Sequence, residues 1–140
     1  MIRLSNVNDF PDVYRLICLL ENRSFDYESL KRIYHEQLQD ERFFCFVYEK
    51  DHEVTGLLNM KMENHLHHCG KVMMVMEFVV QEESRSQGIG SELFEYGVSY
   101  AKEHGCVRIE LETSMWREKA HAFYERHGMI RDHYYYTMNI

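Results

Sequence analysis

The sequence has little proline, no paired cysteine motif and no long apolar run. Its 140 residues include one proline and four cysteines, Cys18, Cys45, Cys69 and Cys106, which lack the C-x-x-C spacing of zinc and redox sites. No apolar run approaches the ~20 residues of a membrane span, and the N-terminus lacks the pattern of a signal peptide. We therefore expect reduced, mostly buried cysteines and a cytoplasmic location without membrane partners.

Positive charge is also scarce. Lysine and arginine number 16 against 23 aspartates and glutamates, and the formal net charge is −7. An acidic chain argues against general nucleic-acid binding and weakly favours cationic partners such as amines. The charged and apolar fractions are those of an ordinary globular protein, and the length predicts one domain over residues 1–140.

The most informative stretch is residues 76–91, MEFVVQEESRSQGIGS. An apolar, β-branched run stops at a polar turn, and Arg-x-x-Gly-x-Gly then opens an amphipathic segment with apolar residues at helical spacing. This pattern predicts a strand, a glycine turn and a helix. Gly88 and Gly90 let backbone N–H groups turn inward, and the positive end of the helix dipole adds to them. We expect a site for a phosphate or pyrophosphate, with Arg85 beside it.

The same residues do not match the motifs of two other phosphate-binding loops. A P-loop requires Gly-Lys-Ser/Thr, and no lysine follows Gly88 or Gly90. A dinucleotide fingerprint requires a third glycine where Leu93 stands. A tight turn without a ligand is the remaining alternative, and the flanking strand and helix favour the phosphate site over it.

The rest of the chain alternates between strand and helix patterns. Asn8 or Asp9 caps a first helix with Pro11 in its first turn, and the apolar run 71–80 predicts a central strand. The expected order is β-α-α-β-β-β-α-β-α-β. Strands are expected at 2–5, 43–48, 58–63, 71–80, 107–113 and 130–140, with Asn59, Lys61 and Glu63 on a polar side; inward helix positions are Val13, Leu16, Ile17, Leu20, Leu30, Ile33, Tyr34, Leu38, Leu93, Phe94, Gly97, Val98, Ala101, Ala120, Phe123, Tyr124 and His127.

The glycine loop resembles the coenzyme A loop of the GCN5-related N-acetyltransferases, Arg/Gln-x-x-Gly-x-Gly/Ala after an apolar strand. A second motif, AHAFYERHGM at 120–129, matches Ala-x-x-Phe-Tyr-x-x-x-Gly-Phe/Met of the same family. With the element order, this resemblance covers essentially the whole chain. It implies an α/β (α+β) fold with a central mixed, mostly antiparallel sheet flanked by helices. It also implies acetyl transfer from acetyl-CoA to an amine without a metal, and Leu111 to Ser114 look most like small-molecule amine acetyltransferases, including those acting on aminoalkylphosphonates.

The resemblance assigns the cofactor contacts. The backbone at the end of the strand, Phe78 to Val80, would pair with the pantetheine arm. The same residues also suit a plain core strand, and the two roles are compatible because backbone and side chains serve different purposes. Arg117 stands where many members carry an asparagine that touches the pantetheine, so an arginine there could instead reach a phosphate or an acidic acceptor. The assigned residues are Phe78, Val79, Val80, Arg85, Ser86, Gln87, Gly88, Ile89, Gly90, Ser91 and Arg117.

Two residues are candidates for proton transfer. Tyr124 matches the family tyrosine that protonates the departing thiolate, a task that suits a phenol; the alternative is a core aromatic. Glu77 interrupts the apolar strand, and a buried carboxylate needs a partner or a raised pKa. Such a group is a candidate general base, directly or through water. A structural ion pair or a solvent-facing edge residue are the alternatives.

The remaining candidates concern the acceptor and a possible metal. Glu21, Phe25 and Asp26 follow the first helix, where the family forms part of its acceptor pocket, although an ordinary charged loop explains them too. The stretch 65–69, HLHHC, lacks the spacing of a zinc site, so we expect solvated hairpin residues and no metal. Alternative functions are a non-catalytic acyl-CoA-binding regulator and a protein N-terminal or lysine acetyltransferase. A homodimer paired through residues 130–140 is also possible.

Overall fold

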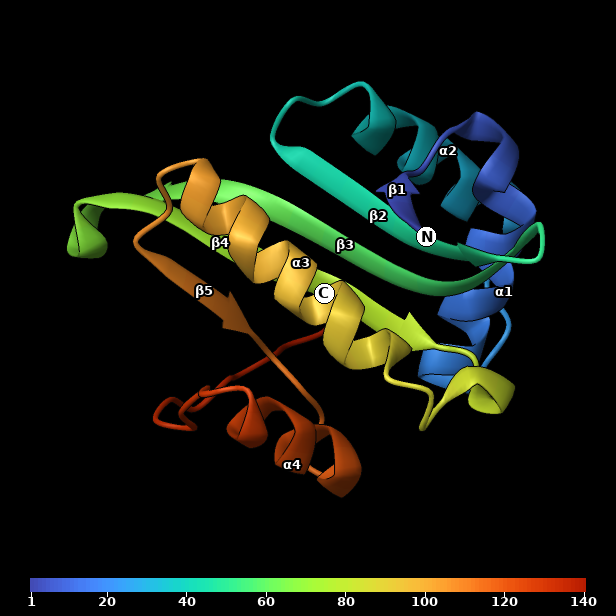
Figure 1. Ribbon diagram of the computed structural model, residues 1–140. Coiled ribbons are helices and arrows are strands. Elements are labelled where there is room, and N and C mark those ends of the chain that lie inside the picture. Colours follow the sequence, from blue (N-terminus) through green and yellow to red (C-terminus); the bar gives the residue numbers. More distant parts are fainter. The chain divides into compact units, whose positions relative to one another are not determined.

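The computed structural model describes residues 1–140 as two compact units, Met1–Glu110 and Leu111–Ile140. A five-stranded sheet in the order β1-β2-β3-β4-β5 organises the first unit (Figure 1). β1 to β4 pair antiparallel, and β5 returns after a helix beside β4 and makes the sheet mixed. The elements are β1 Ile2–Leu4, α1 Phe10–Glu21, α2 Tyr27–Leu38, β2 Phe43–Lys50, β3 Glu53–His65, β4 Gly70–Val80, α3 Ile89–Glu103, β5 Arg108–Leu111 and α4 Glu118–Arg126.

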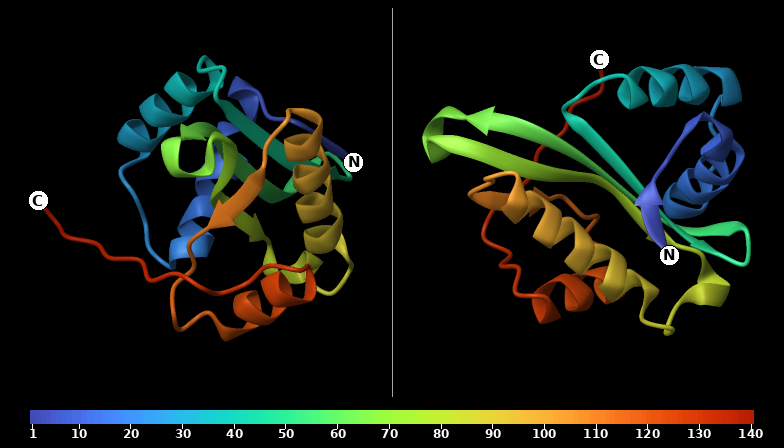
Figure 2. Two further views of the ribbon diagram at one scale, coloured as in Figure 1. Left: turned by 90° about the vertical axis from the view of Figure 1, so that its left-hand side faces the viewer. Right: turned by 45° about the horizontal axis from the view of Figure 1, so that its top comes forward.

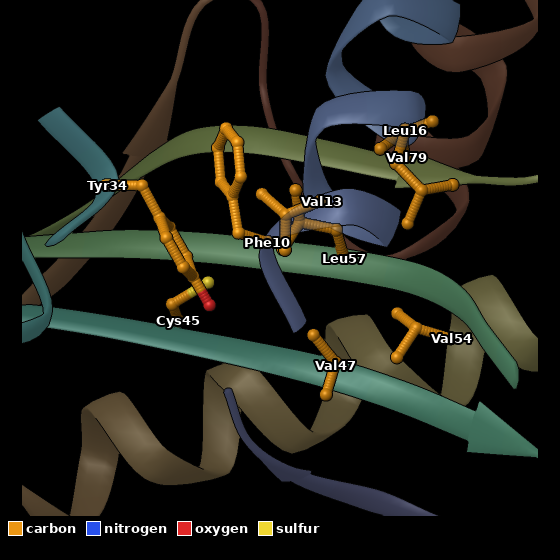
Figure 3. Packing of buried hydrophobic residues seen from close by; sticks show 9 residues of the cluster. All are labelled: Phe10, Val13, Leu16, Tyr34, Cys45, Val47, Val54, Leu57 and Val79. Carbon is orange, nitrogen blue, oxygen red and sulfur yellow. The ribbon is translucent and has the colours of Figure 1, made fainter. Parts of the chain in front are cut away.

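Helices cover both faces of the sheet, with α1 and α2 on one face and α3 on the other (Figure 2). The register places Val47, Leu57 and Val79 side by side on the α1 face, where they pack with Phe10 and other residues of one buried cluster (Figure 3). The middle of β2 and β3, residues 45–47 and 54–60, is therefore continuously buried, because helices cover both faces there.

The opposite face depends on a close approach of α3. The ring centroids of Phe78 and Phe94 lie 6.0 Å apart, and Gly97 faces β3 directly. A Cβ on Gly97 would lie 2.6 Å from Cδ2 of Leu58 and 3.2 Å from Sδ of Met60. The glycine is thus required by packing rather than by backbone conformation.

The cysteines are less buried than expected, since only Cys45 is buried and Cys69 is exposed. Most expected elements form within a few residues of their predicted bounds, but three details of their prediction are wrong. Ile33 and Tyr34 were both expected to face inward, but only Tyr34 is buried, and the Ile33 side chain is 46% exposed. Asn59 is buried rather than solvent-facing, because helices cover both faces of β3. The alternation that suggested an outer polar side therefore does not apply there.

The third error is the final strand. No strand follows α4, and residues 130–140 have no regular secondary structure. Tyr134, Tyr136 and Met138 were expected on one face of a strand, but their side chains are nearly fully exposed. Alternation of side chains describes a strand only where a neighbouring strand accepts its backbone hydrogen bonds.

None of the helices combines the length and apolarity that a bilayer crossing requires.

The packing of α3 gives a test of the fold. Gly97→Val should lower the free energy of unfolding by about 2 kcal/mol, because the new side chain overlaps buried Leu58 and this overlap outweighs the better helix propensity of valine. Urea denaturation measures this loss. Ser99→Val, on the exposed face of the same helix, is the control and should stay within about 0.5 kcal/mol of the parent. Equal losses in both variants would contradict the packing described here.

Candidate active site

The glycine loop joins β4 to α3. A short 3₁₀ turn, Glu82–Ser84, follows β4, and Gly88 then occupies the N-cap position of α3 with φ +79°. This left-handed conformation favours glycine. A Cβ on Gly88 would have no atom within 4 Å, so the space in front of the helix N-terminus is open.

The N-terminus of α3 has no side-chain cap, as is also true of α1 and α4, whereas α2 has one. The Asp26 side chain accepts the backbone N–H of Ser29 at the start of α2, whereas Gly88 offers no side chain to α3. The first N–H groups of a helix have no intrahelical acceptor and carry the positive end of its dipole. An anion bound there would supply the missing acceptors, so the loop fits the pyrophosphate of coenzyme A.

Side chains around the loop hold its shape and add positive charge. Arg85 is exposed, and its Nε donates to the carbonyl oxygen of Val80 at 3.1 Å. Buried Ser84 accepts a hydrogen bond from Gln81. Lys50, which the sequence did not suggest, donates to Oε1 of Gln87 at 3.0 Å. Two cationic side chains thus contact the loop.

The strand end leading into the loop is paired on its β3 side, where Val79 lies opposite Leu57 and Val80 opposite Gly56. On the other side, β5 begins next to Lys71, whose carbonyl accepts the N–H of Val107 at 2.8 Å. β5 has four residues and spans about 13 Å, whereas Val79 lies roughly 26 Å beyond Lys71 along β4. The short β5 therefore ends before Val79 and Val80, which suits pairing with an extended ligand.

Glu77 owes its direction to a β-bulge. Asn59 pairs with Glu77 while Met60 pairs with Val75, so Met76 is an extra residue in β4 and is 48% exposed. Without the bulge, Val75 and Glu77 would share a face, since side chains alternate along a strand. With it, Glu77 joins the α1 face together with Asn59.

The Glu77 carboxylate sits in a polar cluster within the apolar layer. Nδ2 of Asn59 donates to Oε2 of Glu77 at 2.8 Å and to Oε1 of Gln37 at 3.0 Å. Burial and the nearby Glu21 carboxylate raise the pKa of Glu77, and the hydrogen bond from Asn59 opposes that rise. The expectation of a partner and a raised pKa is confirmed, and the partner is an amide rather than a cation. Oδ1 of Asn59 is buried without a hydrogen-bond partner, so it can accept a hydrogen bond from a bound group.

The three predicted acceptor residues have different surroundings. Glu21, the last residue of α1, acts on Glu77 through its charge, so the structure brings these carboxylates together. The carbonyl of Phe25 accepts the Tyr14 hydroxyl at 2.7 Å, and its ring lies under the guanidinium of Arg23 at 4.3 Å. The Asp26 carboxylate is engaged in capping α2.

Tyr124 and Arg117 belong to the second unit. Arg117 precedes α4 as its N-cap residue, and its guanidinium lies 4.6 Å from the Trp116 ring centre. Burial raises the pKa of the Tyr124 phenol, and the charge of Arg117 acts against this rise. The phenol therefore holds its proton at neutral pH, as a proton donor must. The roles of both residues stay predictions.

Asn59 and Gln37 were missed by the sequence analysis. Asn59 gave a weak signal as an amide within the apolar run 54–60, but strict alternation assigned it to solvent. Gln37 gave no signal in the sequence, because only the packing of α2 on the sheet determines which side chain of α2 reaches Asn59.

Comparisons with known proteins bear on the family and the fold of the chain. The sequence model of the Acetyltransferase (GNAT) family matches residues 10–129. The chain is 32% identical to aminoalkylphosphonate N-acetyltransferase of Salmonella typhimurium over 97% of its length and 88% of that protein. It is 25% identical to human N-alpha-acetyltransferase 30, covering 94% of this chain and 35% of that protein. The crystal structure of a transcriptional regulator from Bacillus halodurans C-125 superposes with a TM-score of 0.92, 25% identity, and coverage of 100% and 99% of the two chains.

The uncapped helix gives a test of cofactor binding. Gly88→Glu should abolish coenzyme A binding, because a carboxylate would occupy the anion site and repel the pyrophosphate. Isothermal titration calorimetry with coenzyme A measures this loss.

Gly105→Glu is the matched control for this variant. Gly105 follows the same helix, has φ +74° and also has open space at its Cβ, so the substitution carries a similar backbone strain away from the loop. It should bind coenzyme A as the parent does. Unchanged affinity in Gly88→Glu would refute the loop as the pyrophosphate site.

Proposed function

Because the chain belongs to the acetyltransferase (GNAT) family and is an acetyl-CoA-dependent N-acetyltransferase, we propose that it acetylates the primary amine of a small molecule by direct attack. The observation that carries this proposal is Glu77, a half-buried carboxylate with a raised pKa that is held by Asn59 beside the strand end. A carboxylate of raised pKa matches the task of taking a proton from an ammonium group near neutral pH.

In the proposed mechanism the glycine loop anchors the pyrophosphate, and the backbone of Val79 and Val80 holds the pantetheine arm. Glu77 accepts a proton from the ammonium, directly or through one water. The amine nitrogen then bonds to the thioester carbonyl carbon as the carbon–sulfur bond breaks. Tyr124 donates its phenolic proton to the departing sulfur, and the second proton lost by the acylated nitrogen returns to the Tyr124 oxygen, directly or through water. The products are therefore a neutral amide and a free thiol.

The charges of Glu77 and of the segment after α1 favour a particular kind of acceptor. Glu21 and Glu77 are two carboxylates that suit an ammonium group. Arg23, stacked on Phe25 in the segment after Glu21, supplies a cation that suits an anionic group on the same molecule. We therefore propose aminoalkylphosphonates as the acceptor class, and the Salmonella relative, named for that activity, supports this choice.

A panel of amines tests the proposal through thiol release from acetyl-CoA. An aminoalkylphosphonate should give the highest kcat/KM, and the alkylamine of equal length without the phosphonate should fall at least about 10-fold below it. Polyamines, aminoglycosides and an N-terminal peptide complete the panel. Preference for the peptide would favour the protein acetyltransferase alternative, and no release with any amine would favour a non-catalytic binder.

Tyr124→Phe separates proton donation from packing. If Tyr124 protonates the thiolate, kcat should fall about 10²-fold while the affinity for acetyl-CoA barely changes, because one hydroxyl is lost and the ring remains. Tyr96→Phe, which removes a partly exposed hydroxyl from α3, is the control and should keep the parent kcat. An unaltered kcat in Tyr124→Phe would make this residue a core aromatic only.

Glu77→Gln tests the general base through its pH dependence. The parent kcat/KM should rise with pH through the raised pKa of Glu77, since the base works only when ionised. Glu77→Gln cannot take a proton and should lose this rise, with partial recovery at alkaline pH where free amine is present. Steady-state profiles with an acceptor of low amine pKa measure both, and exposed Glu28→Gln should keep the parent profile. Identical profiles for parent and Glu77→Gln would make Glu77 structural.

A further inference from the structure

Three histidines gather at the tip of the β3–β4 hairpin, on the strands that carry Asn59 and Glu77. His65 ends β3, and a 3₁₀ turn covers Leu66–His68. The turn reverses the chain directly after the extended residue His65 and brings the His65 and His68 rings together, with centroids 5.8 Å apart. The His67 and His68 centroids are 4.1 Å apart, and one ring nitrogen of each of the three residues lies within 4.8 Å of the others.

Two of these rings each have one nitrogen close to a carboxylate oxygen. Nε2 of His65 lies 3.4 Å from Oε1 of Glu63, and Nε2 of His68 lies 3.3 Å from Oε2 of Glu110. Histidines that bind metals usually give their second ring nitrogen to a carboxylate, which fixes the ring and leaves the other nitrogen for the metal. The nitrogen left on His65 is Nδ1, which is buried and has no hydrogen-bond partner.

We propose that His65, His67 and His68 bind a divalent transition-metal ion of the Zn²⁺ or Ni²⁺ class, with solvent in the remaining coordination positions. Neutral imidazole nitrogens are preferred ligands of these ions. Zinc–nitrogen bonds of about 2.0–2.1 Å place two ligand nitrogens roughly 3.4 Å apart on one tetrahedral ion. The three ligand nitrogens lie within 4.8 Å of one another, so side-chain rotations, of the exposed His67 above all, would have to bring them closer on binding.

The spacing of HLHHC is not that of a zinc site, and by itself it predicts solvated hairpin residues without a metal. The turn at Leu66–His68 brings the rings of His65 and His68 to the same side of the hairpin tip. The spacing of the histidines in the sequence does not reveal this arrangement. In the structure His65 and His68 are half-buried rather than solvated hairpin residues.

The proposed ion takes no part in acetyl transfer. The His65–Gly70 pair lies about 20 Å along the hairpin from the Asn59–Glu77 pair. Its expected effect is on stability, because the tip projects beyond the neighbouring strands (Figure 2), and a two-stranded extension is weakly stable by itself. An ion bound to both ends of the turn would hold the tip closed and stabilise the folded state.

Isothermal titration of chelator-treated protein with ZnCl₂ tests the proposal. One equivalent should bind, and His65→Gln and His67→Gln should each weaken binding about 10²-fold or more. Glu63→Gln should weaken it about 10-fold through loss of the carboxylate behind His65. His52→Gln is the matched control, since His52 lies alone in the tight β2–β3 turn, and it should bind as the parent does.

Thermal unfolding and a cobalt spectrum complete the test. ZnCl₂ should raise the Tm of the parent and of His52→Gln but not that of His67→Gln, whose exposed side chain is not needed for folding. Bound Co²⁺ should show no thiolate charge-transfer band. No binding by the parent, equal binding by His65→Gln, or a thiolate band lost in Cys69→Ser would each overturn the three-histidine site.

Discussion

One extra residue in β4 determines which face of the sheet carries the Glu77 carboxylate. Before Met76, β4 alternates in register with β3, and Val75 packs on the α3 side with Met60. The bulge at Met76 shifts the alternation, so the next residue, Glu77, turns to the α1 face. A carboxylate thereby enters a layer that is otherwise apolar, and Asn59 is the side chain that accommodates it.

The same strand then continues into the glycine loop, which makes the two parts of the site depend on each other. Val79 anchors the strand end through the buried cluster that includes Leu57, and Gly88 begins α3 without a side-chain cap. Close packing of α3 at Gly97 fixes that helix against β3. The Glu77 carboxylate and the candidate anion site at Gly88 are therefore carried by one continuous segment, which pairs with β3 and packs against α1 and α3.

Much of the fold and of the candidate site could be predicted from the sequence, because the residue patterns that indicate them are local. The glycines, the apolar strand before them and the helical periodicity after them predicted the loop, and the interruption of an apolar run by Glu77 predicted a carboxylate needing a partner. The partner itself, the bulge and the histidine cluster were not predicted, because each depends on register or on turn geometry. The expected strand at 130–140 failed for a related reason: its pattern is local, whereas a strand requires a neighbour.

The most direct test of the account is the ionisation of Glu77 itself. Carbon-13 NMR of protein labelled at glutamate carboxyls, with the signal assigned by its absence in Glu77→Gln, follows this titration. The account predicts that the pKa of Glu77 lies above the ordinary glutamate value and rises further in Asn59→Leu, because that variant removes the amide which stabilises the ionised form. A Glu77 carboxyl that titrates at the ordinary value, and does not respond to Asn59→Leu, would contradict it.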